Sequence, residues 1–157
     1  MATEIRIRPL SPADHEAAVN LARSLPEFFN DQGIDEMTTE IPTESGAVAE
    51  VDGELVGFVT WTATPELGHI GWIAVRGDHH RHGIGRRLIQ VAEDDARRVG
   101  APVLQVETLG ESVDYEPYDR TRAFYRSVGF VDLESVLLDN PGMPEMLTLQ
   151  KRLSKAS

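Results

Sequence analysis

Apolar and polar positions change their period along the chain, and these changes predict an order of strands and helices. Residues 4–8 alternate with a period of two, which predicts a strand. Residues 12–25 place their apolar side chains at helical spacing; Ser11 and Pro12 suit a helix start, and Pro26 ends the pattern. Residues 26–45 are polar and irregular, so they predict either a second short helix or a substrate-binding loop.

Strands dominate the next part of the chain. Apolar runs predict strands at residues 47–51, 55–62 and 69–75, and Asp52-Gly53 is a hairpin turn signal between the first two. Because the connections are short, the three strands are expected to form an antiparallel meander. Residues 83–99 then carry a long helical pattern that Gly100 ends.

The last third of the chain returns to strands. A strand is predicted at residues 103–108, followed by a loop at 109–118 that is rich in acids and tyrosine. A short helix is expected to begin at Asp119 and to end at Gly129. Two more strands follow, at 131–138 and 146–153. The pattern predicts one mixed α/β (α+β) domain over residues 1–157, with a largely antiparallel sheet.

Composition limits what such a domain can be. The chain has 157 residues, of which 41% are hydrophobic, so it can bury a core. It has no cysteine, which excludes disulfides, a thiolate nucleophile and cysteine-ligated zinc.

The formal net charge of -11 disfavours nucleic acid and anionic membranes as partners, because both repel an acidic surface. The negative charge is compatible with a cationic substrate. Solubility alone is the other explanation for it. The N-terminal residues are charged and no segment approaches the ~20 apolar residues that span a membrane. We therefore expect a cytoplasmic protein without a signal peptide.

One segment carries candidate chemistry. The strand at 69–75 leads into a basic loop, and the loop opens a helix through Gly83-Ile84-Gly85. The first N–H groups of a helix lack partners within the helix and lie at its positive end, so they bind phosphate well. Basic side chains in an acidic chain support an anion site here: Arg76, Arg81, Arg86 and Arg87.

Other uses of this loop fit less well. A Walker loop is absent, and a dinucleotide fingerprint, with Glu107 holding the ribose, would lack its third glycine. The histidines at 79, 80 and 82 invite a metal, but three positions so close in one loop cannot easily converge on one ion. We expect no metal.

The loop His80-Arg81-His82-Gly83-Ile84-Gly85 resembles the pyrophosphate-binding motif of the GNAT superfamily of acetyl-CoA-dependent N-acetyltransferases, Gln/Arg-x-x-Gly-x-Gly/Ala, with His80 at the Gln/Arg position. The segment 123–130 is similar to the family's late helix, which ends Tyr-x-x-x-Gly-Phe. The resemblance covers nearly the whole chain. It implies a sheet of about six or seven strands flanked by about four helices, splayed between the fourth and fifth strands.

The resemblance also implies acetyl-CoA as co-substrate. Pantetheine would bind backbone groups of Ile73, Ala74 and Val75. The pyrophosphate would bind the N–H groups and side chains at the helix start, namely Arg81, His82, Gly83, Ile84, Gly85 and Arg86. Proteins of this family are often homodimers, and a homodimer is compatible with the sequence.

In this family the amine attacks the thioester directly, so a base and an acid are needed. His69 occupies the position where the family often has a glutamate base; Glu107, Glu66 or an ordered water chain are the alternatives. Tyr125 matches the family's general acid, and as a residue on an apolar helix face it also suits the core.

The acceptor would face two regions. The early one contains Phe28 and Phe29, and the late one contains Asp114, Glu116 and Tyr118. Acids with aromatics suit an ammonium group, so a small-molecule or peptide amine that is cationic is expected, although both regions are equally typical of surface loops. A non-catalytic acyl-CoA-binding module is the alternative function.

Overall fold

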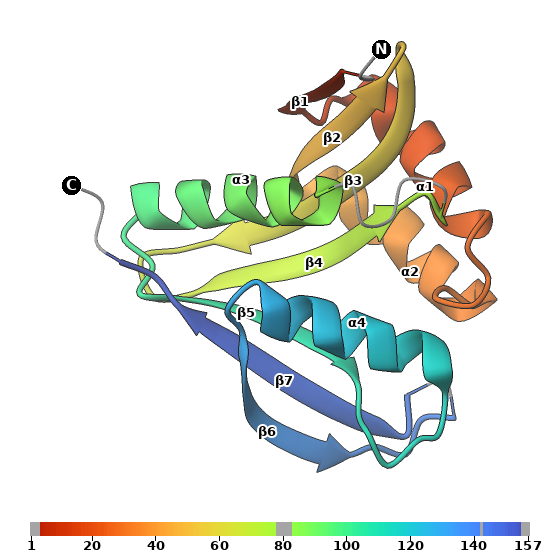
Figure 1. The fold of residues 1–157 in the computed structure, drawn as a ribbon, viewed down its shortest axis with the longest axis vertical. Coiled ribbons are helices and arrows are strands. Elements are labelled where there is room, and N and C mark those ends of the chain that lie inside the picture. Colours follow the sequence, from red (N-terminus) through yellow and green to blue (C-terminus); the bar gives the residue numbers. More distant parts are fainter. Residues whose placement is uncertain (1–3, 78–82, 142, 155–157) are drawn as a thin grey trace. The chain divides into compact units, whose positions relative to one another are not determined.

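The computed structural model describes residues 4–77, 83–141 and 143–154. Its elements are β1 (Ile5–Pro9), η1 (Pro12–Asp14), α1 (His15–Arg23), α2 (Asp31–Glu40), η2 (Ile41–Thr43), β2 (Ser45–Val51), β3 (Glu54–Ala63), β4 (Gly68–Val75), α3 (Ile84–Arg98), β5 (Val103–Leu109), α4 (Glu116–Ser127), β6 (Val131–Leu137) and β7 (Glu145–Arg152). Figure 1 shows these elements. The strands form a 7-stranded sheet in the order β1-β2-β3-β4-β5-β7-β6. The pairing of β4 with β5 is parallel, and the other registered pairs are antiparallel.

The chain divides into two compact units. Unit 1 contains Met1–Thr62 and Ile70–Asp95, and unit 2 contains Ala63–His69 and Ala96–Ser157. Strand β4 contributes its first two residues to unit 2 and the rest to unit 1. Within unit 2, those two residues pair with β5, Gly68 with Leu104 and His69 with Gln105. The splay predicted beyond this point stays a prediction.

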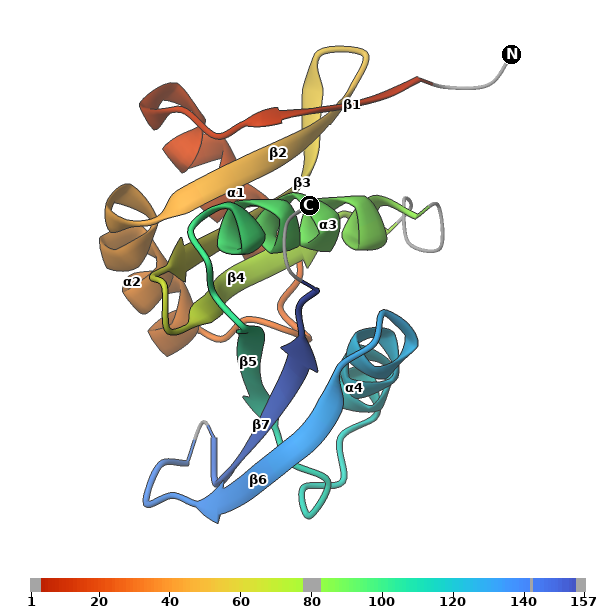
Figure 2. The same cartoon turned by 90° about the vertical axis from the view of Figure 1, so that its left-hand side faces the viewer.

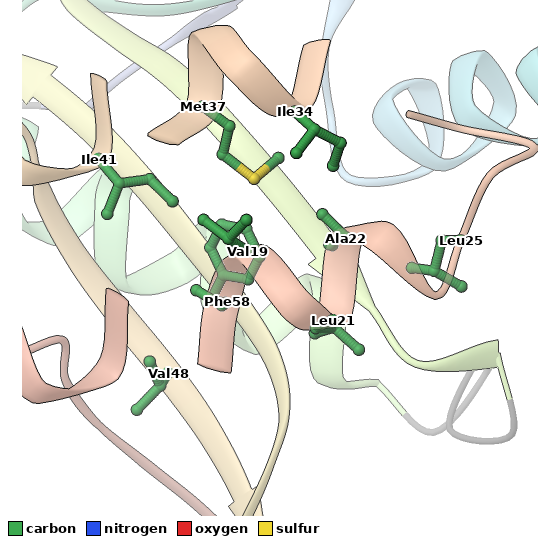
Figure 3. Packing of buried hydrophobic residues seen from close by; sticks show 11 residues of the cluster. Val19, Leu21, Ala22, Leu25, Ile34, Met37, Ile41, Val48 and Phe58 are labelled. Atoms are coloured by element: carbon green, nitrogen blue, oxygen red, sulfur yellow. The ribbon is translucent and has the colours of Figure 1, made fainter. Parts of the chain in front are cut away.

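Unit 1 has its core between α1, α2 and one face of the sheet. Met37 of α2 points toward Val19 of α1 and Phe58 of β3, and Met37 and Phe58 are fully buried (Figure 3). The apolar positions that predicted the first helix, Ala18, Leu21, Ala22 and Leu25, are all buried in this cluster. The helical spacing therefore identified the core face of α1.

Helix α3 belongs to the opposite face of the sheet in unit 1. Side chains alternate between the two faces of a strand, so Gly57 faces away from its neighbour Phe58. A Cβ atom on Gly57 would meet Ile84 and Leu88 of α3. On the same face Trp61 donates from Nε1 to Asp95 Oδ2 at 2.8 Å. The turn Asp52-Gly53 has positive φ at both residues, 53° and 78°, which confirms the predicted hairpin.

Unit 2 is built from β5, β7, β6 and α4. Strand β7 pairs along its length with β5 on one side and with β6 on the other (Figure 2). Helix α4 contacts β5. Leu104, Leu149 and Phe130 are buried in its core. Strand β6 lies at the edge of the sheet, and all its residues are exposed.

The structure decides one open prediction and corrects another. Residues 31–40, where helix and loop were both open, form α2, whose start is capped by the Asn30 side chain accepting from the Gly33 N–H at 2.8 Å. Helix α4 begins at Glu116, so the prediction of a loop to residue 118 and a helix start at Asp119 was wrong. Pro117 suits the first turn of a helix, because its missing N–H is not needed there.

Candidate active site

The start of α3 has the features of an anion site. Gly83 precedes the helix with φ 77°, a conformation that favours glycine, and a Cβ atom there would meet nothing within 4 Å. The Arg87 N–H donates to the Gly83 carbonyl at 3.0 Å, so residues 84–86 precede the first hydrogen bond of the helix. The first N–H groups of a helix generally lack partners within it, which makes this turn a candidate anion site. No acid lies in this first turn.

The other residues predicted to bind the cofactor are on β4 and in the loop before α3. Ala74 is buried in the core cluster of unit 1, and Ile73 and Val75 are partly buried. The predicted ligands Arg81 and His82 lie outside the described residues, as do His79 and His80. In unit 1 the structure thus places Ile73–Val75 in β4 and Ile84–Arg86 in the first turn of α3.

Unit 2 brings His69 and Glu107 into direct contact. His69 Nε2 lies 2.7 Å from Oε1 and 2.9 Å from Oε2 of Glu107. The exposed side-chain fractions are 34% and 29%, so both groups remain open to solvent. The parallel register pairs His69 with Gln105, which puts Glu107 two residues further along the same face of β5. The sequence offered the two residues as alternatives for one role, whereas the structure joins them.

Tyr125 of α4 is the third candidate in this unit. Its side chain is buried, with its ring 5.7 Å from that of Phe130 and 5.5 Å from that of Phe124. Burial raises the pKa of Tyr125, and the charges of Tyr118 and Glu107 raise it further. Helix α4, which carries Tyr125, contacts β5, which carries Glu107. All three residues predicted to be catalytic lie in unit 2.

The predicted acceptor residues are in two different settings. Phe28 and Phe29 pack against the core cluster of unit 1, with the Phe29 ring 6.3 Å from that of Trp72. Tyr118 is half-buried in α4, and burial raises its pKa, with a smaller effect of Tyr115. Asp114 is exposed. Glu116 is exposed as well and pairs with Arg120 one turn along the helix, at 3.1 Å.

Arg122, a buried arginine of unit 2, was not among the predicted site residues. Only 3% of its side chain is exposed. The guanidinium donates to the Leu109 carbonyl at the end of β5 and to Asp119 of α4, and its Nε lies 3.9 Å from Glu111. It thus holds the residues between β5 and α4 in place. Its signal in the sequence was its helical spacing of three from Tyr125, on the face that α4 buries.

Two findings limit the chemistry of the described residues. None of the groups of histidine and acidic side chains among them is arranged to hold a metal ion. No described helix is long and apolar enough to cross a membrane.

Several solved structures are similar to this chain. Among solved structures, a protein assigned to the GNAT family of acetyltransferases from Desulfovibrio desulfuricans matches with a TM-score of 0.84 and 21% identity, over 96% of this chain and 100% of that one. Ard1 from Thermoplasma volcanium matches with a TM-score of 0.76 and 24% identity, over 96% and 99%. An aminoglycoside 6'-N-acetyltransferase complexed with coenzyme A matches with a TM-score of 0.73 and 17% identity, over 97% and 99%.

The TM-scores of these three structures show that they share the fold of this chain. No curated protein matches the sequence. The sequence profile of the Acetyltransferase (GNAT) family matches residues 15–130, which is more than half of the chain. The profile therefore includes the start of α3, the contact between His69 and Glu107, and Tyr125, and the chain belongs to the GNAT family of acetyltransferases.

Proposed function

We propose that the protein transfers the acetyl group of acetyl-CoA directly to a primary amine of a cationic acceptor. The observation that carries this proposal is the contact between His69 and Glu107 in unit 2, the unit that also contains Tyr125. A direct transfer needs a base for the amine and an acid for the departing thiolate, and these three residues include a candidate for each. The chain has no cysteine, so an acyl-thiol intermediate on the enzyme is excluded.

His69 is proposed as the base, with Glu107 as its partner. When Nε2 carries the proton and donates it to the Glu107 carboxylate, Nδ1 is the basic nitrogen of the neutral ring. The carboxylate also stabilises the imidazolium that forms when the ring accepts a proton from the amine. The distances of 2.7 and 2.9 Å support this role for Glu107.

Tyr125 is proposed as the acid. Because its pKa is raised above the usual value of about 10, the phenol keeps its proton throughout the neutral range. It can then donate that proton as the carbon–sulfur bond breaks and the thiolate of CoA leaves. The oxyanion of the tetrahedral intermediate would be stabilised by a backbone N–H of β4 near Val75.

The cofactor would be held mainly by backbone groups. The pyrophosphate would bind the N–H groups at the start of α3, from Gly83 to Arg86, with help from Arg81 and His82 in the preceding loop. Pantetheine would bind backbone groups of residues 73–75. A neighbour in fold, the aminoglycoside 6'-N-acetyltransferase, was solved in complex with coenzyme A, which supports this use of the fold.

The acceptor is proposed to be a small-molecule or peptide amine. In unit 1 Phe28 and Phe29 offer aromatic surface, and in unit 2 Tyr118, Asp114 and Glu116 offer aromatic and acidic groups; groups of both kinds suit an ammonium. The aminoglycosides on which a neighbouring enzyme acts are themselves polycations. The formal net charge of -11 would attract such acceptors.

A thiol-release assay with acetyl-CoA and a mixed library of amines, polyamines, amino acids and peptides tests the proposal. We expect CoA release with at least one cationic primary amine, and a fall in the rate for the His69→Gln variant. Binding of acetyl-CoA without thiol release across the whole library would contradict the enzyme and favour an acyl-CoA-binding module. An anionic or apolar acceptor as the best substrate would contradict the proposed acceptor class.

A further inference from the structure

A carboxylate lies against β4 in unit 1, just before the segment proposed to bind pantetheine. It belongs to Glu44, which follows η2 and precedes β2. A Cβ atom on Gly71 would lie 2.6 Å from Oε1 of Glu44, closer than non-bonded atoms approach. Only glycine at position 71 leaves the carboxylate this place. The side chain of Glu44 is partly buried, so its charge is only partly solvated.

A hydroxyl links this carboxylate to the backbone of β4. Thr60 is fully buried, and its Oγ1 accepts from the Trp72 N–H at 3.0 Å. Its own proton is then available to the Glu44 Oε1 atom, which lies 3.2 Å away. The hydroxyl thus orients a carboxylate oxygen beside the strand, at Gly71 and Trp72.

The face of the sheet on which the Glu44 carboxylate lies decides which part of a ligand it can contact. Thr60 is two residues from Phe58 on β3, so both side chains point to the face that α1 and α2 cover. Helix α3, which begins at Ile84, packs on the opposite face. A ligand with its phosphates at the start of α3 therefore meets Glu44 only if its other end, or a second ligand, lies on the α1–α2 face of β4.

Aromatic rings lie along the same stretch of β4. Trp72 directly follows Gly71, and Phe29 is its ring neighbour. The Trp72 Nε1 atom is buried and has no hydrogen-bond partner among the described residues. A carboxylate binds an ammonium group by charge, and an aromatic ring binds one by cation–π attraction.

We propose that Glu44 binds the positively charged group of the acceptor, with Thr60 orienting the carboxylate and Gly71 leaving space for it. The inference rests on the proposed transfer to a cationic amine and names the residue of unit 1 that selects the acceptor. An ordinary structural contact would explain the hydrogen bond to Thr60. It would not predict that the affinity for cations depends on the charge of Glu44.

Calorimetric titration of the CoA-saturated protein with 1,5-diaminopentane and with its neutral counterpart 1,5-pentanediol tests this. We expect wild type to bind the diamine more tightly than the diol. Glu44→Gln, which keeps the shape and loses the charge, should weaken diamine binding roughly tenfold to a hundredfold, the range for a hydrogen bond to a charged group. Its affinity for CoA should not change. Glu40→Gln, an exposed acid on the neighbouring helix, is the matched control and should bind as wild type does.

A second variant separates binding from folding. Thr60→Val keeps the size of the side chain and removes the hydroxyl, so it should reduce the preference for diamine over diol while the Glu44 charge remains. The melting temperature of each variant shows whether it folds. Equal diamine affinity in wild type and a folded Glu44→Gln variant, or no preference for diamine over diol in wild type, would overturn the inference. If diamine binding depends on Glu44 but no amine releases thiol from acetyl-CoA, the proposed transfer fails and the cation site stands.

Discussion

The start of α3 and the neighbourhood of Glu107 offer a ligand different kinds of atoms. In unit 1 the candidate groups are backbone N–H groups of residues 84–86, one after another in a single helical turn. In unit 2 they are side-chain atoms of His69, Glu107 and Tyr125, which come from β4, β5 and α4. A backbone site tolerates many side chains and needs only the right φ and ψ angles. A side-chain site depends on every residue identity and on the register of the strands.

The largest expected effect concerns Tyr125, one of the three candidate catalytic side chains of unit 2. In the Tyr125→Phe variant the ring and its packing remain and only the hydroxyl is lost. Without a positioned acid the chemical step should slow ~10²–10⁴-fold, while acetyl-CoA affinity and the melting temperature stay close to wild type. Single-turnover rates measure this step even when product release limits turnover. A chemical step as fast as that of wild type would remove Tyr125 from the mechanism.

The next largest effect is expected at the backbone N–H groups at the start of α3. Gly83 and Gly53 have nearly equal φ angles, 77° and 78°, and a Cβ atom would have open space at both. Alanine at either position is strained by about 1–2 kcal/mol. We expect Gly83→Ala alone to weaken acetyl-CoA binding, roughly tenfold or more, because the strain displaces the N–H groups of the first turn.

Gly53→Ala controls for the strain itself, because it lies in the hairpin turn between β2 and β3. It should lower stability without changing acetyl-CoA affinity. Thermal melts and cofactor titrations of both variants measure the two effects. Equal loss of affinity in both variants would mean that strain, not the phosphate site, explains the result.

A smaller effect is expected at Arg122, the buried arginine that connects β5 with α4 in unit 2. In Arg122→Leu the Leu109 carbonyl loses its donor, and the free energy of unfolding should fall by ~1–3 kcal/mol. Arg120→Leu is the matched control, since Arg120 is exposed and its pair with Glu116 contributes ~0–1 kcal/mol. Denaturant unfolding measures both changes. Similar losses in the two variants would contradict the anchoring role of Arg122.

The smallest effect is expected at the exposed acids before and within α4. Asp114→Asn and Glu116→Gln should raise the KM for a cationic acceptor by about two- to fivefold each, since exposed charges act weakly through water. The KM for acetyl-CoA should not change. Steady-state kinetics at low and high ionic strength measure this, and the effect should shrink as salt is added. A change in the KM for acetyl-CoA instead would place these acids on the cofactor side.

The alkaline range tests the environment of Tyr125 without a mutation. Its pKa is raised in the folded protein, so the neutral phenol is favoured by folding. That contribution to stability is complete below the ordinary tyrosine pKa of about 10 and is lost as the pH rises through the folded value. Melting temperatures from pH 8 to 11 should therefore fall less steeply for Tyr125→Phe than for wild type. Parallel curves would indicate that burial does not perturb this phenol.

Much of the fold could be predicted because its signals are local. The Asp52-Gly53 turn, the apolar face of α1 and the glycine after α3 each act within a few residues, and the structure has all three elements. The start of α4 was missed because the acids and tyrosines of 109–118 were interpreted as a loop. Pro117 was the local signal for a helix start, and it was not used.

The candidate site was less predictable, since its contacts are not local. The contact between His69 and Glu107 depends on the parallel register of β4 with β5, which joins residues 38 apart in sequence. No spacing in the sequence gives that register. Arg122 and Glu44 were missed because charged residues are usually exposed, and their partners lie on other elements.

The aromatic residues are distributed so that each unit has its own chromophore. The sequence has two tryptophans, Trp61 and Trp72, and both lie in unit 1. Its three tyrosines, at 115, 118 and 125, all lie in unit 2. Indole fluorescence, excited beyond the tyrosine absorption band, therefore reports on unit 1 alone. Unlabelled protein thus allows the response of unit 1 to coenzyme A, to an amine or to denaturant to be followed without a signal from the tyrosines of unit 2.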